Sequence, residues 1–104
     1  DLILEKNILL SNSSIKKCLI ESTSRIDESL MLPIRWSRVG LILRGGWLFG
    51  KNKESFGHNG WGGSLGFADP TLGIGVAYTT NKINPTMATD QRIINLLRKF
   101  YEVI

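Results

Sequence analysis

Cysteine and histidine are nearly absent from this 104-residue chain, which contains one of each. A lone Cys18 permits no internal disulfide and no site built from several cysteines, so a small side chain that is buried or half-buried is expected there. The single His58 likewise excludes a metal site made of several histidines. We therefore expect neither a metal ion nor another cofactor.

Long apolar runs and clustered charges are also missing. A membrane-spanning helix needs about 20 consecutive apolar residues, and no segment approaches that length, so no membrane span is expected. The net charge is +4, but the lysines and arginines are scattered, which favours a solvated surface over a nucleic-acid partner. The sequence begins with Asp1, so the lack of a signal peptide leaves the compartment unknown.

The first third of the chain, residues 1–35, is expected to form a helical and loop segment that leads into the sheet. Residues 2–10 are mainly apolar and are expected to be helical or irregular. The cluster Ser11–Ser14 suits a helix N-cap, whereas the polar residues 22–30 predict a loop. The helix after the cap is expected to have one apolar face formed by Ile15, Cys18 and Leu19.

Residues 36–83 predict an antiparallel sheet of about four to five strands. The expected strands are 39–44, 47–49, 55–59, 64–69 and 74–81, separated by the Gly45-Gly46 pair and by turns at 51–54 and 70–73. The turn chemistry of residues 70–73 makes the last two strands a hairpin. Small and large residues alternate along this hairpin, so both of its faces are expected to be covered by helical layers.

Residues 85–104 have the strongest helical pattern. Thr86 or Thr89 can cap the start of this helix, and Asp90 suits its positive N-terminal end. A stripe of apolar side chains at helical spacing predicts that the helix packs on the sheet, and it consists of Ile93, Leu96, Leu97, Phe100 and Ile104.

A distinctive motif follows the third expected strand. Residues 56–70 read FGHNGWGGSLGFADP, which places His-x-Gly at a strand end, before a glycine-rich turn and a hairpin. This pattern resembles the C-terminal third of the serine β-lactamase and penicillin-binding-protein superfamily. It is most similar to the class C-like esterase branch, where His-x-Gly often replaces Lys-Thr-Gly. The resemblance is densest over residues 55–81 and fades before Arg35.

The resemblance implies a fold class and a function for the complete protein. The fold would be α+β, with an antiparallel sheet, a C-terminal helix packed on one face and an N-terminal helical segment, within a larger β-lactamase/transpeptidase-like fold. The activity would be hydrolysis of a small-molecule ester or amide through an acyl-serine intermediate.

The resemblance also implies roles for four residues. The backbone N–H of Trp61 would stabilise the oxyanion, and Gly60 would let the substrate lie close to the strand. His58 would take the place of the family's lysine, while the Asn59 amide would face the acyl pocket. Because an imidazole is only partly charged near neutral pH, esters or amides are favoured over β-lactams.

The family's other two motifs are not recognisable in this chain. Ser-x-x-Lys occurs at 13–16 and 14–17, but too close to His58 for the family order, and helix capping is the favoured interpretation of these serines. Tyr-x-Asn is missing, because Tyr78 and Asn81 are three positions apart. We therefore expect the chain to be inactive alone and to need the missing N-terminal portion of its domain. The alternatives are a non-catalytic binding or regulatory module and a remnant without function.

Overall fold

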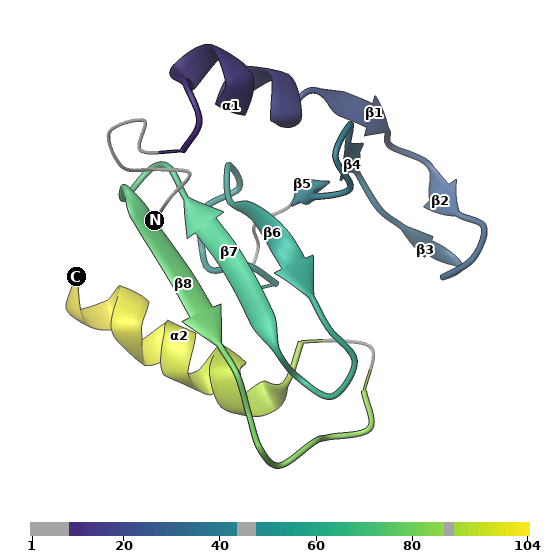
Figure 1. Cartoon of the computed structure of the whole chain (residues 1–104). Helices are drawn as coiled ribbons and strands as arrows, with labels where there is room; N and C mark the ends of the chain where they lie inside the picture. Colours follow the sequence, from purple (N-terminus) through teal and green to yellow (C-terminus); the bar gives the residue numbers. More distant parts are fainter. Residues whose placement is uncertain (1–8, 44–47, 87–88) are drawn as a thin grey trace.

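The computed structural model describes residues 9–43, 48–86 and 89–104. The predictions for residues 2–8, for Gly45-Gly46 and for Trp47 lie outside this part of the chain. An antiparallel sheet forms the centre of the molecule, with one helix along a face of it and the other helix at one end (Figure 1). Neither helix is long and apolar enough to cross a membrane in the part that is described.

The main sheet has six strands in the order β1-β4-β5-β6-β7-β8, and β2 and β3 pair separately. The strands are β1 (Glu21–Thr23), β2 (Ile26–Asp27), β3 (Leu32–Pro33), β4 (Trp36–Ser37), β5 (Ile42–Leu43), β6 (Phe56–Asn59), β7 (Leu65–Asp69) and β8 (Ile74–Tyr78). Every pair is antiparallel. The predicted α+β class with an antiparallel sheet is confirmed.

The N-terminal helix α1 (Asn12–Cys18) begins as the serine cluster predicts. The Ser11 side chain accepts a hydrogen bond from the Ser14 N–H at 3.1 Å, which satisfies one of the free donors at a helix start. The expected apolar face is half-buried, including Cys18. The loop predicted at 22–30 is wrong in part, because β1 ends and β2 lies within it.

The strand predicted at 39–44 begins late. Gly40 has a φ of +80° and its N–H donates to the Ser37 carbonyl at 3.1 Å, so Val39 and Gly40 form the turn between β4 and β5. The alternating apolar residues at 39–43 therefore belong to a turn and to the short strand β5 (Ile42–Leu43) that follows it, and not to one long strand. Leu48 and Phe49 are not strand either, and Phe49 is fully buried in the core.

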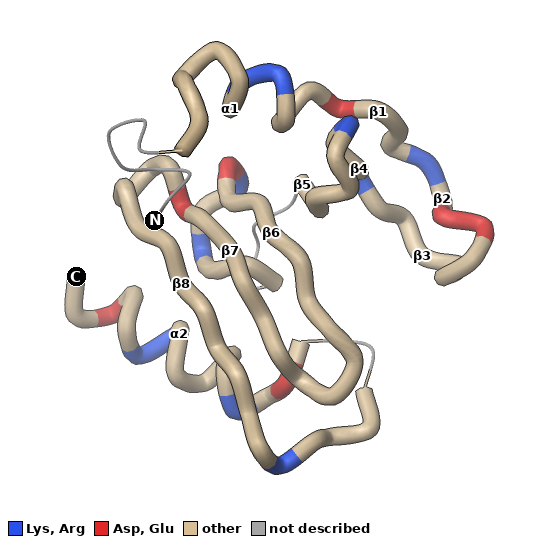
Figure 2. Tube along the Cα trace, viewed as in Figure 1, with Lys and Arg blue, Asp and Glu red and all other residues tan. Residues whose placement is uncertain are grey.

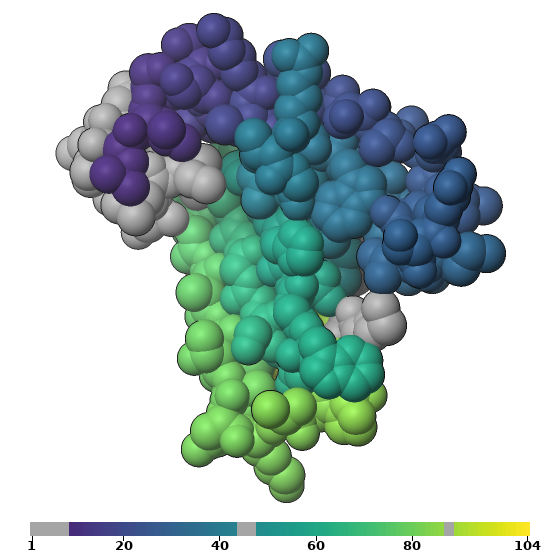
Figure 3. Space-filling model, turned by 45° about the vertical axis from the view of Figure 1, so that its right-hand side comes forward, coloured from purple at the N-terminus to yellow at the C-terminus, as the bar shows by residue number. Residues whose placement is uncertain are grey.

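The predicted hairpin of β7 and β8 is confirmed, together with its two unlike faces. Leu65 pairs with Tyr78 and Phe67 with Val76, on the face that carries the core. Glycines and alanines pair on the other face, which we call the small face and define by Gly66, Ala68, Gly75 and Ala77. α1 and the segment up to β5 gather at one end of the molecule (Figure 3).

The C-terminal helix α2 (Gln91–Val103) packs on the core face, but in a different rotation from the predicted one. Its buried residues are Ile93, Leu97 and Tyr101, whereas Leu96, Phe100 and Ile104 are exposed. The threonine caps are also wrong, because Asp90 is the N-cap and accepts from the Arg92 N–H at 2.8 Å.

A buried hydrogen-bond network explains the rotation of α2. The Tyr101 hydroxyl donates to Asp69 Oδ2 at 2.5 Å, and Asn52 Nδ2 donates to the same oxygen at 2.8 Å. Asp69 Oδ1 accepts from the N–H groups of Thr71 and Leu72, at the β7–β8 turn. A fully buried carboxylate requires such partners, so Asp69 draws the tyrosine, rather than its apolar neighbour, into the core.

Charged residues are dispersed over the described chain. Figure 2 shows lysines and arginines on α1, on the loops and on α2, with acidic residues among them. This distribution agrees with the scattered charge of the sequence, and it forms no continuous basic stripe along the trace.

Candidate active site

The end of β6 carries the His-x-Gly motif into an exposed position. β6 pairs with β5 at Phe56 and Gly57, whereas it pairs with β7 as far as Asn59. β6 therefore continues beyond its last pairing with β5. Over this stretch burial changes, from buried at Phe56 and Gly57 to exposed at His58 and Gly60.

Packing within the sheet explains the glycine at position 57 but not the one at position 60. A Cβ on Gly57 would lie 2.2 Å from the Gly66 carbonyl oxygen, so the packing of β6 on β7 excludes any larger residue. A Cβ on Gly60 would meet nothing closer than 3.9 Å. The described part of the chain thus contains no packing reason for glycine at position 60.

The His58 imidazole is held by two contacts. Its Nδ1 lies 2.7 Å from the Asn59 carbonyl oxygen. Because a carbonyl only accepts hydrogen bonds, Nδ1 must carry the proton, and Nε2 holds the lone pair in the neutral ring. The second contact is with the Trp36 indole, whose ring centroid lies 5.8 Å from that of the imidazole at an interplanar angle of 35°.

A tight turn joins the motif to β7. The Gly60 N–H donates to the Ser64 carbonyl at 2.8 Å, and the Gly63 N–H donates to the Gly60 carbonyl at 3.3 Å. Gly62 and Gly63 have φ values of +93° and +113°, which side-chain-bearing residues rarely adopt. Trp61 lies at the tip with 64% of its surface exposed. Its backbone N–H forms no hydrogen bond within the described residues.

The segment after β8 clamps this turn from outside. The Gly62 N–H donates to the Thr86 carbonyl at 3.2 Å, and the Asn84 N–H donates to the Gly62 carbonyl at 3.0 Å. Asp90 lies against Gly63, whose Cβ, if present, would be 2.7 Å from Asp90 Oδ2. The turn is therefore fixed on both sides of Trp61.

Asp90 is itself held in its charged form. Arg92 Nη2 lies 2.6 Å from Asp90 Oδ2 and also donates to the Lys82 carbonyl at 2.8 Å. Hydrogen bonds from the Arg92 side chain, followed by the Arg92 backbone N–H, lower the pKa of Asp90 to about 2. Asp90 and Arg92 thus link the start of α2 to the glycine-rich turn.

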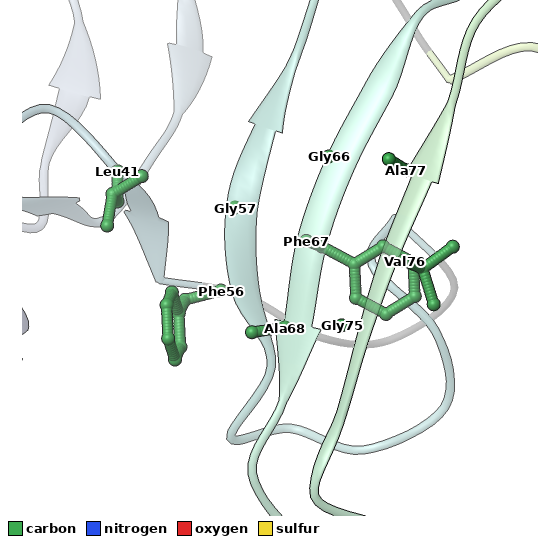
Figure 4. Close-up of a pocket in the computed structure, with 9 residues that line it drawn as sticks. All are labelled: Leu41, Phe56, Gly57, Gly66, Phe67, Ala68, Gly75, Val76 and Ala77. Atoms are coloured by element: carbon green, nitrogen blue, oxygen red, sulfur yellow. The ribbon is translucent and has the colours of Figure 1, made fainter. Parts of the chain in front are cut away.

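The small face forms a shallow hollow beside β6. This hollow has a volume of about 340 Å³ and includes all four small-face residues (Figure 4). His58 pairs with Gly66 in the sheet, so it belongs to the same row of residues. A second cavity of about 200 Å³ lies on the other side of Phe56, and Leu41 and apolar residues of α1 also line it.

The serines of the two Ser-x-x-Lys strings lie in α1 rather than beside His58. Ser13 and Ser14 both have their hydroxyls 3.0 Å from the Ser11 hydroxyl, at the cap of the helix. This placement agrees with the capping interpretation. Within the described ranges, no three His, Cys, Asp or Glu side chains gather where they could hold a metal ion.

Two residues that contact this region were not predicted from the sequence: Trp36, and Asp90 in its role at the turn. Both lie far from the motif in the sequence, and the strand pairing and the clamp bring them close. The position of Asp90 could have been inferred, since an aspartate directly before a helical stripe is a good N-cap. No feature of the sequence distinguishes Trp36 from an ordinary aromatic residue of the core.

The solved structures that are similar to the chain include two from this class of fold. One is a family VIII carboxylesterase, with 37% identity and a TM-score of 0.85, over 91% of this chain and 26% of that chain. The other is a penicillin-binding protein homolog from Caulobacter crescentus, with 30% identity and a TM-score of 0.88, over 99% of this chain and 29% of that chain. No protein-family model and no curated protein matches.

The fold and the motif together define a part of a β-lactamase-like hydrolase fold. The chain belongs to the serine β-lactamase and penicillin-binding-protein superfamily. It spans about a quarter of the length of each of the two structures described above.

Proposed function

We propose that this chain forms one wall of the active site of a serine hydrolase that cleaves small esters or amides through an acyl-serine intermediate. The nucleophile would come from the N-terminal portion of the same domain, outside this chain. The observation that carries the proposal is the Trp61 N–H, which is held in a clamped turn next to Gly60 and makes no hydrogen bond within the described residues.

The Trp61 N–H is suited to stabilise an oxyanion. A backbone donor that is fixed before the reaction needs no reorganisation when negative charge develops, and loss of one such donor typically costs about 10²–10³ in rate. Gly60 lies directly before it, with open space where a Cβ would be. A substrate carbonyl can therefore approach the strand backbone at this point.

His58 and Asn59 would position the reacting groups. The Nδ1 proton of His58 is engaged by the Asn59 carbonyl, which leaves Nε2 to accept a hydrogen bond from a hydroxyl. A lysine ammonium in this place only donates. The Asn59 side chain, half-buried at the end of β6, would face the acyl group. This chemistry favours esters or amides over the carboxylate-bearing β-lactams.

The small face would receive the missing portion of the domain. Residues without bulky side chains let a helix or strand approach closely, and Gly66 and Ala77 are exposed here. The length of the matched structures supports this proposal, since this chain covers only about a quarter of each. The chain alone would then lack the nucleophile and be inactive.

The proposal is tested with the reading frame that precedes Asp1. A Ser-x-x-Lys followed by a Tyr-x-Asn in that frame supports it, and the whole protein can then be assayed with p-nitrophenyl butyrate and with a chromogenic cephalosporin. We expect ester hydrolysis, weak β-lactam turnover, and an ester rate reduced about 10²-fold or more in His58→Ala, as for other acid–base groups. Leu72→Ala, in the exposed β7–β8 turn, is the matched control.

Two results would change the conclusion. An unaltered ester rate in His58→Ala overturns the role given to that residue. An upstream frame without the nucleophile motif favours the alternative, a non-catalytic binding or regulatory module.

A further inference from the structure

We propose that Trp36 is a positioning residue for His58, and that the indole and the Asn59 carbonyl together hold the imidazole in one orientation and one tautomer, with Nε2 as the accepting nitrogen. The inference deepens the proposed function, because it assigns a chemical state to a residue of that site. It also makes a claim about the chain alone, which can be measured without any catalytic activity.

The contact between the two rings is the first observation. The centroids are 5.8 Å apart and the planes are tilted by 35°, within the range of favourable aromatic pairs. His58 is otherwise exposed. An exposed imidazole with only a hydrogen bond to its own neighbouring peptide can rotate about its side-chain bonds, whereas a ring packed on an indole loses that freedom.

The indole is itself fixed in place. Trp36 Nε1 donates to Asp27 Oδ2 at 3.0 Å. The other oxygen of Asp27 accepts from the N–H groups of Ser29 and Leu30, at 2.9 and 2.8 Å. The backbone of Trp36 pairs with Ile42 in β5, so the tryptophan is held both by its strand and by its ring nitrogen.

The charge on Asp27 strengthens this arrangement. The Leu30 N–H is the largest cause of a lowered pKa at Asp27, and the Trp36 N–H contributes in the same direction. Asp27 is therefore a carboxylate at neutral pH, and a hydrogen bond to an ionised acceptor is stronger than one between neutral groups. The β2–β3 turn thus supports the indole, and the indole supports His58.

The consequence for His58 is chemical. A neutral imidazole can carry its proton on either nitrogen, and the hydrogen bond made by one nitrogen decides the state of the other. With Nδ1 donating to the Asn59 carbonyl, Nε2 accepts. If the ring turned, Nε2 could carry the proton and the site would present a donor instead. Trp36 would therefore set which role His58 plays.

The single histidine of the chain makes the tautomer directly measurable. The ¹⁵N-labelled 104-residue chain is examined by long-range ¹H–¹⁵N NMR at a pH where the imidazole is neutral. We expect a predominant Nδ1–H form in the wild type and a several-fold shift of the tautomer ratio toward Nε2–H in Trp36→Leu. Trp36→Phe keeps a ring and is expected to restore most of the wild-type ratio, even though it cannot bond Asp27.

Phe100→Leu is the matched control, because it removes a partly exposed ring from α2, which packs on the core face of the sheet. We expect the wild-type tautomer ratio in this variant. Circular dichroism establishes that each variant is folded, and Trp36→Phe replaces Trp36→Leu if the latter unfolds, with a small but measurable shift expected. A wild type that is mainly Nε2–H, or a ratio unchanged in every folded Trp36 variant, overturns the proposal.

Kinetics of the whole protein separate this inference from the proposed function. If both hold, Trp36→Leu lowers kcat more than it raises KM, and adding it to His58→Ala causes no further loss. If the NMR shift occurs but His58→Ala leaves the ester rate unchanged, the positioning contact stands and the catalytic proposal fails. If His58→Ala is impaired but no folded Trp36 variant alters the tautomer ratio, the catalytic proposal stands and the positioning role of Trp36 fails.

Discussion

The carboxylate of Asp90 lies against the backbone of Gly63, so closely that a Cβ on that glycine would come within 2.7 Å of Asp90 Oδ2. Asp90 also caps α2. One side chain thus connects the start of the C-terminal helix to the turn that presents the Trp61 N–H. The geometry of the proposed oxyanion donor and the stability of α2 should therefore respond to the same substitutions.

Gly63→Ala is expected to destabilise the chain by about 1–3 kcal/mol, through a positive φ and a contact with a buried carboxylate. Urea unfolding followed by circular dichroism measures the change. Gly66→Ala is the matched control, because a Cβ there would have no atom within 4 Å and no positive φ is imposed. Equal losses of stability in the two variants would contradict this account of the turn.

Asp90→Asn is expected to retain a helix cap but to remove the ion pair with Arg92, and so to lower the melting temperature at pH 7 by a few degrees. The pKa of Asp90 is lowered from 3.8 to about 2. The extra stability of the wild type is therefore present above pH 4 and is lost as the pH falls toward 2. Melting curves over this range test the prediction, and a difference between the two proteins that stays constant down to pH 2 would refute it.

Tyr101→Phe removes the hydroxyl that donates to buried Asp69, at an expected cost of about 1.5–3 kcal/mol for a hydrogen bond to a charged group. Burial, followed by the hydrogen bond to Asp69, raises the pKa of Tyr101 above its usual 10.0. The wild type should therefore lose stability as the pH rises above about 10, because unfolding releases the phenolic proton. The phenylalanine variant lacks this contribution, so the two unfolding curves should converge at alkaline pH.

Gly66→Leu places a large side chain on the small face and tests whether the complete protein covers it. In this chain alone a leucine there enters open space, so stability should change by no more than about 0.5–1 kcal/mol. In the whole protein it should block close packing and lower the yield of folded, active enzyme. Ala77 offers a second position on the same face. Normal folding and activity of both leucine variants would argue against a packed small face.

The elements that the sequence predicted well are those set by local chemistry. The β7–β8 hairpin follows from its turn residues and from alternation at a period of two, and Asp69 caps its turn through side-chain hydrogen bonds. The residues of the candidate site are also contiguous in the chain, from His58 to Trp61. A motif of this kind is visible in the sequence before any contact is known.

The elements that the sequence predicted poorly depend on distant partners. Tyr101 joins Ile93 and Leu97 in the core in place of the expected Phe100, because its hydroxyl reaches Asp69, a contact that no helical periodicity encodes. Trp36 meets His58 only because the intervening strands fold between them. The turn at Gly40 depends on a left-handed backbone that an alternating pattern conceals.

The order of the sheet has a final consequence for the handling of this chain. β8 is an outer strand of the described sheet, with β7 on one side. An outer strand exposes a row of backbone donors and acceptors, which invites pairing with a second chain and so promotes aggregation. Aggregation of the chain should therefore increase with its concentration, and Ala77→Lys, at an exposed position of β8, is expected to reduce it.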